Sequence, residues 1–163
     1  MKAPREPDRL QTSMNTLLTT ALAQLPHGPE FRFLDRLLSL EPGICGVGEY
    51  TLRGDEPFLR GHFPGHPLLP GVLLLEAAAQ LAGVVAQSDP SLPPLEDLKL
   101  TAVRAAKILG APHPGETLTL HAKIVGRMGR LIQAQATATT RGQLILQCEI
   151  TLAGGVPEVS PVL

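Results

Sequence analysis

The stretch VLLLEAAAQLAGVVAQ, from Val72 to Gln87, carries only two polar side chains, Glu76 and Gln80, before its last residue. A helix that is apolar on all sides must be buried. A membrane span is disfavoured, because the run is short once it begins at Pro70-Gly71, lacks basic flanks and places a carboxylate at its middle. The stretch therefore predicts one buried helix at the centre of a globular domain.

Three runs towards the C-terminus have the alternating apolar and polar pattern of half-buried strands. They cover residues 118–124, 132–139 and 146–152. The connections near Met128-Gly129 and Arg141-Gly142 are short, so we expect an antiparallel meander with one apolar face. Residues 99–108 are a further strand candidate with a weaker pattern.

Residues 31–40 and 44–52 predict another strand pair, joined by a turn at Glu41-Pro42-Gly43, with bulges or bends expected at Gly46 and Gly48. Apolar spacing from Asn15 to Leu25 predicts a short amphipathic helix that ends at 26–28. We expect residues 1–14 to form a flexible extension and residues 15–163 a single domain. The predicted class is α+β, with a long antiparallel sheet wrapped around one buried helix, which is the hotdog fold.

The composition excludes several kinds of function. The 163 residues are 44% apolar and 18% charged, as in an ordinary globular domain, and the net charge is −1 with 3% aromatic residues. We therefore expect neither nucleic acid nor a membrane as a partner. Cys45 and Cys148 are predicted to be reduced, buried thiols. Residues 1–13 lack the apolar segment of a secretory signal, so a cytoplasmic location is expected.

The segment GHFPGHPLLPG, residues 61–71, leads into the predicted helix and contains three prolines. Proline fixes the backbone, so this loop can hold His62 in one place. The first helical turn, from Gly71 onward, offers free N–H groups to a developing negative charge. Together with Glu76 these groups suit proton abstraction next to a carbonyl. An alternative is purely structural, because Gln80 lies one turn from Glu76 and can satisfy one carboxylate oxygen.

Residues 62–80 resemble, without a gap, the His-Phe-Pro-Gly…Pro-Gly-Val…Glu-Ala…Gln signature of the 3-hydroxyacyl-acyl carrier protein dehydratases of type II fatty acid synthesis. Leu25-Pro26-His27, with Phe33-Leu34-Asp35-Arg36, is similar to the start of that family's domain. Pro114-Gly115-Glu116 is similar to its Pro-Gly-Asp turn. The resemblance covers roughly residues 15–152. Leu69 replaces a usual Met, and residues 100–112 lack the family's aromatic residues, so an aliphatic acyl tunnel is expected.

The resemblance implies dehydration of a (3R)-3-hydroxyacyl thioester on acyl carrier protein to a trans-2-enoyl thioester. His62 would remove the C2 proton, and Glu76 would protonate or orient the leaving hydroxyl, with Gln80 positioning Glu76. The pair would come from different subunits of a homodimer, or of a trimer of dimers. No metal or organic cofactor is implied. The residues expected to bind the thioester or the substrate are Gly71, Val72, Gln80, Phe63 and Pro64.

Other interpretations stay open. The hotdog fold also serves acyl thioesterases and non-catalytic acyl-binding modules. His62 and His66 have a helical metal-site spacing, but the prolines between them prevent a helix, so no metal site is predicted. Three further histidines are interpreted as solvated loop or strand-surface residues, and three basic residues either contact the acidic carrier protein or are simply solvated. The histidines are His27, His113 and His121, and the basic residues are Arg60, Arg104 and Lys107.

Overall fold

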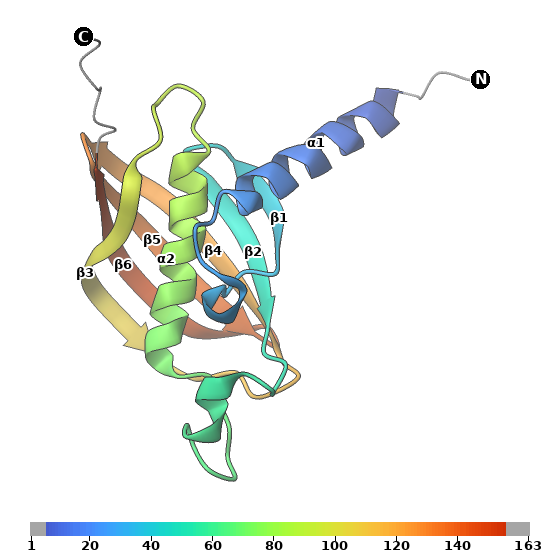
Figure 1. The fold of residues 1–163 in the computed structure, drawn as a ribbon, viewed down its shortest axis with the longest axis vertical. Helices are drawn as coiled ribbons and strands as arrows, with labels where there is room; N and C mark the ends of the chain where they lie inside the picture. The colour runs from blue at the N-terminus through green and yellow to red at the C-terminus, as the bar shows by residue number, and fades with distance from the viewer. Residues whose placement is uncertain (1–5, 156–163) are drawn as a thin grey trace.

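A six-stranded antiparallel sheet, in the order β1-β2-β4-β5-β6-β3, curls around a long helix in the computed structural model, which describes residues 6–155 (Figure 1). The strands are β1 (Arg36–Glu41), β2 (Cys45–Thr51), β3 (Glu96–Ile108), β4 (Thr117–Met128), β5 (Leu131–Thr140) and β6 (Gln143–Gly155). The helices are α1 (Glu6–Ala23), α2 (Gly71–Gln87) and the short 3-10 helices η1 (Pro29–Phe31) and η2 (Pro57–Arg60).

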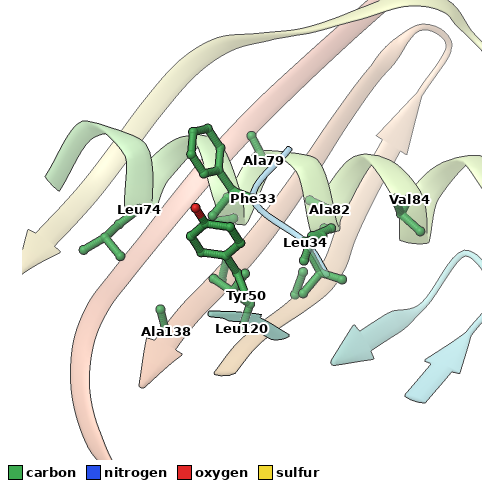
Figure 2. Close-up of a cluster of buried hydrophobic side chains, with 14 of the residues drawn as sticks. Phe33, Leu34, Tyr50, Leu74, Ala79, Ala82, Val84, Leu120 and Ala138 are labelled. Carbon is green, nitrogen blue, oxygen red and sulfur yellow. The ribbon is translucent and has the colours of Figure 1, made fainter. Parts of the chain in front are cut away.

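The central helix α2 forms the middle of the core, as its apolar sequence predicts. Its side chains pack against inward-facing residues of β2, β4, β5 and β6, and Figure 2 shows Leu74 and Ala82 of the helix in one cluster of buried side chains with Tyr50 and Leu120 of the sheet. Small alanine side chains let the sheet approach the helix closely. Among residues 6–155, no helix combines the length and the hydropathy that crossing a membrane requires.

The strand predictions are confirmed for the C-terminal meander and for the strand formed by residues 96–108. The N-terminal strand is shorter than predicted and begins at Arg36 instead of Phe31. The chain before it forms η1 and then buries Phe33 and Leu34 in the core, where Phe33 makes an edge contact with Tyr50 (Figure 2). This segment therefore contributes to the core without joining the sheet.

The first helix also begins earlier than predicted, at Glu6 instead of Asn15. Most of the expected flexible extension, residues 6–14, is therefore helical, and only residues 1–5 of it lie outside the described part. Pro7 does not prevent this, because a proline in the first turn removes an N–H that has no helical partner anyway. Figure 1 shows that the first half of α1 extends away from the sheet, so only its second half packs on the domain.

The expected bulge is on the neighbouring strand. The register between β1 and β2 shifts between Leu37 and Ser39 of β1, whereas the residues of β2 from 45 to 49 pair regularly with β4. The two glycines of β2 are explained by packing and not by a bulge. A Cβ on Gly46 would lie 2.8 Å from Val85 Cγ2 on α2, and one on Gly48 would lie 2.9 Å from Leu34 Cδ2. Glycine is needed here because buried side chains press against the strand.

We predict that Gly46→Ala lowers the free energy of unfolding by about 1–3 kcal/mol, because the added methyl overpacks the contact with Val85. Urea denaturation of the purified protein measures this. Gly126→Ala on β4 is the matched control, since its Cβ would meet no atom closer than 3.5 Å. Equal stability of the Gly46 variant and the parent protein would show that the contact does not constrain the strand.

Candidate active site

Glu76 lies in the second turn of α2, and its side chain is 23% exposed. One carboxylate oxygen, Oε1, accepts a hydrogen bond from Gln80 Nε2 at 3.0 Å and lies 3.2 Å from His27 Nε2. No hydrogen bond from another described residue reaches Oε2. The two oxygens therefore have different environments, since Oε1 accepts from Gln80 and lies near His27, whereas Oε2 accepts from no described residue.

Gln80 is 2% exposed and has a fixed orientation. Its side-chain oxygen accepts from the N–H of Phe33 at 2.9 Å, and its amide nitrogen donates to the carbonyl of Phe31 at 2.8 Å as well as to Glu76. A backbone N–H can only donate, so the amide group cannot be flipped. The predicted contact between Gln80 and Glu76 is present. Gln80 also joins α2 to the segment before β1, so its structural and positioning roles coexist.

The carboxylate of Glu76 borders a cavity of about 700 Å³ between α2, β3 and the turn after α1. The cavity extends along α2 as far as Gln87, about 16 Å further along the helix at 1.5 Å per residue. Eight of its 17 lining residues are aliphatic, seven are polar or charged, and Phe31 supplies the one phenyl ring. The apolar lining side chains include Leu25, Ala79, Val84, Leu98, Leu100 and Leu152. A long apolar chain would fit such a space.

His62 lies in the loop between η2 and α2. Its Nδ1 is 3.2 Å from the carbonyl oxygen of Leu68, and its ring stacks on Phe63 with the ring centroids 4.2 Å apart. A carbonyl only accepts, so this contact places the proton on Nδ1 and leaves a lone pair on Nε2. The loop is fixed further by Leu68 N–H donating to the His62 carbonyl and Leu69 N–H donating to the Pro112 carbonyl. Nε2 of His62 is thus prepared to accept a proton.

The start of α2 leaves two backbone donors available. They are the N–H groups of Gly71 and Val72, which lie in the first turn, where a helix has no internal acceptors. The next N–H, that of Leu73, donates to the Pro70 carbonyl. A Cβ on Gly71 would lie 2.9 Å from Ile108 Cδ1, so glycine is favoured by the close approach of β3.

Within one chain, the predicted site residues form two groups. Glu76 and Gln80 border the cavity, and His62 does not. Phe63 and Val72 are 53% and 69% exposed, and Pro64 is also exposed. This separation is compatible with the expectation that the histidine and the carboxylate meet across two subunits, which stays a prediction.

Of the three histidines predicted to be solvated, His113 and His121 are exposed as predicted. The prediction is wrong for His27, whose imidazole is partly buried. The turn after α1 folds against α2 and brings His27 to Glu76, while the ring also stacks on Phe31. Only long-range packing creates this contact. The one sequence signal was the match of Leu25-Pro26-His27 to the dehydratase pattern.

Both cysteines are free, as predicted. Cys148 is buried, and burial raises the pKa of its thiol to about 11. Cys45 is only half-buried, contrary to prediction, because it starts β2 on a position that alternates away from the core. Among residues 6–155, no three His, Cys, Asp or Glu side chains converge as a metal site would require.

These features define a hotdog-fold domain with a carboxylate on its central helix and a histidine on the loop before it. A sequence model of the FabA-like domain matches residues 25–149, which run from the end of α1 into β6. The chain belongs to the FabA-like family, as its sequence motif predicts.

Curated relatives match most of the chain. A protein of Chloroflexus aggregans is 38% identical over 133 residues, covering 81% of this chain and 91% of the relative. A protein of Lactococcus lactis is 35% identical over 148 residues, covering 88% and 99%. Both are named 3-hydroxyacyl-[acyl-carrier-protein] dehydratase FabZ. These names support the predicted enzyme class.

Solved structures confirm the predicted fold. A chain of the dehydratase heterocomplex ApeI:P from Xenorhabdus doucetiae has a TM-score of 0.71 and 18% identity, with coverage of 86% of this chain and 92% of that one. Zebra fish thioesterase superfamily member 2 has a TM-score of 0.62 and 19% identity, covering 90% and 98%. At these identities the similarity concerns the fold alone, which dehydratases and thioesterases share.

We predict that Glu76→Gln leaves thermal stability unchanged or raised, because the Gln oxygen can accept the same hydrogen bonds and the ionisable group is gone. Turnover of a 3-hydroxyacyl carrier-protein substrate should fall by at least about tenfold to a hundredfold, because the amide cannot donate a carboxyl proton. Parallel melting curves and rate measurements test both statements. Full turnover with a clearly lowered melting temperature would assign Glu76 a structural role.

Proposed function

We propose that this chain removes water from (3R)-3-hydroxyacyl-acyl carrier protein to give trans-2-enoyl-acyl carrier protein, in the synthesis of fatty acids or related acyl chains. The observation that carries the proposal is Glu76 on a largely apolar helix at the edge of a cavity, with one oxygen accepting from Gln80 and lying 3.2 Å from His27 Nε2. The Glu76 side chain is only 23% exposed, and withdrawing a carboxylate from water is unfavourable, which disfavours a purely structural position. Membership of the FabA-like family supports the same reaction.

In the proposed reaction, Nε2 of His62 accepts the proton from C2 of the substrate. The C–H electron pair first moves onto the thioester oxygen as an enolate and then forms the C2–C3 double bond, while the C3–O bond breaks with its electrons going to the hydroxyl oxygen. Glu76 gives its proton to that oxygen, which leaves as water. The N–H groups of Gly71 and Val72 hold the thioester oxygen while it carries negative charge. Solvent then returns a proton from His62 to Glu76, so the cycle needs no cofactor.

The proposal includes a homodimer, in which the His62 loop of one subunit faces Glu76 of the other. β3 pairs with β6 on one side only among the described residues, and nearly all of its side chains are exposed. Unpaired strand edges are normally covered or paired. Large apolar side chains surround this edge and the start of α2, namely Val72, Val103, Ile108 and Leu109, all exposed in the single chain. A trimer of such dimers remains a prediction.

The acyl chain of the substrate would occupy the aliphatic cavity beside Glu76, and the phosphopantetheine arm would enter past the His62 loop. Basic residues near this loop and on β3 are candidates to contact the acidic carrier protein. They are Arg60, Arg104 and Lys107, all exposed. We place the enzyme in the cytoplasm, a location that two free thiols support.

The test is an assay of the purified protein with 3-hydroxyacyl carrier-protein substrates of graded chain length, followed by mass spectrometry. We expect loss of one water from the acyl group. His62→Ala should lower the rate by about 10²- to 10⁴-fold, as for loss of a general base. His66→Ala, an exposed histidine of the same loop, is the control and should retain the rate.

Two outcomes would contradict the proposal. Release of a free thiol without an enoyl product would identify a thioesterase instead. Binding of the acyl carrier protein with no chemical change, at any chain length, would favour a non-catalytic acyl-binding module. A His62→Ala protein that is as fast as the parent would remove this histidine from the mechanism.

A further inference from the structure

His27 is held in place from two directions. The guanidinium of Arg32 donates to the carbonyls of Leu25 and His27 at 3.2 Å and 3.3 Å, which fixes the turn after α1. The imidazole stacks on Phe31, with the ring planes 29° apart. The Phe31 carbonyl in turn accepts from Gln80, which also donates to Glu76. The turn and the carboxylate therefore belong to one connected arrangement.

The surroundings of the ring favour one tautomer. Nε2 of His27 lies 3.2 Å from Oε1 of Glu76, whereas Nδ1 is buried and has no hydrogen-bond partner among the described residues. A proton on Nδ1 would leave a buried donor unpaired, which is costly. A proton on Nε2 instead faces a carboxylate oxygen 3.2 Å away, and hydrogen bonds to charged acceptors are among the stronger kinds. The neutral ring with its proton on Nε2 satisfies both observations.

We propose that His27 is a positioning residue that selects which oxygen of Glu76 acts on the substrate. Oε1 already accepts from Gln80 at 3.0 Å, and in this role His27 Nε2, which lies 3.2 Å from the same oxygen, donates to it as well, so that the lone pairs of Oε1 are used. The substrate hydroxyl must then meet Oε2, and the transferred proton resides on Oε2. When Glu76 gives up that proton, the two N–H donors on Oε1 stabilise the carboxylate charge. This inference rests on the proposed dehydration for its kinetic consequence, but not for the hydrogen bond itself.

Three variants separate this role from simple packing. His27→Phe keeps a ring against Phe31 and removes both nitrogens. His27→Gln places an amide nitrogen at the same number of bonds from the backbone as Nε2, and His27→Asn places it at the position of Nδ1. In His27→Phe, kcat should fall by about tenfold to a hundredfold, as for loss of one hydrogen bond to a charged group, with little change in KM.

The conservative variant provides the decisive comparison. His27→Gln should restore kcat to within about threefold of the parent, whereas His27→Asn should resemble His27→Phe. The melting temperature of His27→Phe should not fall, because a buried nitrogen without a partner is removed. A kcat for His27→Phe within about twofold of the parent would overturn the proposal. So would an equal loss of kcat and melting temperature in the Phe and Gln variants.

A spectroscopic measurement tests the hydrogen bond whether or not the protein dehydrates anything. In the parent protein with ¹⁵N-labelled histidine, the His27 signals, assigned by their absence in His27→Gln, should show a proton on Nε2 and a lone pair on Nδ1. The Nε2–H signal should shift in Glu76→Gln. A proton on Nδ1, or no shift, would overturn the proposal. Failure of dehydration by the parent protein would instead overturn the proposed function.

Discussion

The part-buried contact between Gln80 and Glu76 is the constraint on which the site depends. Before its last residue, Gln87, α2 carries only these two polar side chains, so they must satisfy each other and the nearby backbone. Gln80 does this with Phe31, Phe33 and Glu76, and its amide cannot rotate without breaking a bond to the backbone. The carboxylate orientation is therefore determined by the same bonds that attach the N-terminal segment to the core.

In the other half of the site, hydrogen bonds of the loop before α2 likewise fix the orientation of His62. The carbonyl of Leu68 fixes the tautomer of His62, and the backbone bonds at both ends of the loop keep the ring beside Phe63. Such preorganisation is what proton abstraction requires, because little rearrangement is then needed in the transition state. In the single chain, however, His62 does not border the cavity that Glu76 borders. The proposed site therefore needs a second subunit, which the exposed edge of β3 can bind.

The sequence predicts those features that local patterns control. Two-residue alternation gives the meander, and an apolar run without a polar face gives α2. The contact of Gln80 with Glu76 follows from helical spacing. Features that arise from packing between distant segments were missed. Position 46 needs glycine because Val85 of α2 packs against it. His27 reaches Glu76 only because the turn after α1 folds onto α2. The early start of α1 is not evident from the sequence, because residues 1–14 lack the apolar spacing that marks the helix from Asn15 onward.

The central claim, a catalytic site shared by two subunits, has a direct test in heterodimers. His62→Ala chains and Glu76→Gln chains, carrying different affinity tags, are produced together, and the mixed dimer is purified by both tags. Each such dimer would contain one site with both native residues and one site with neither. The account predicts about half of the parent activity in the mixed dimer and almost none in either parental variant. Activity in the mixed dimer no higher than in the two single variants would contradict it.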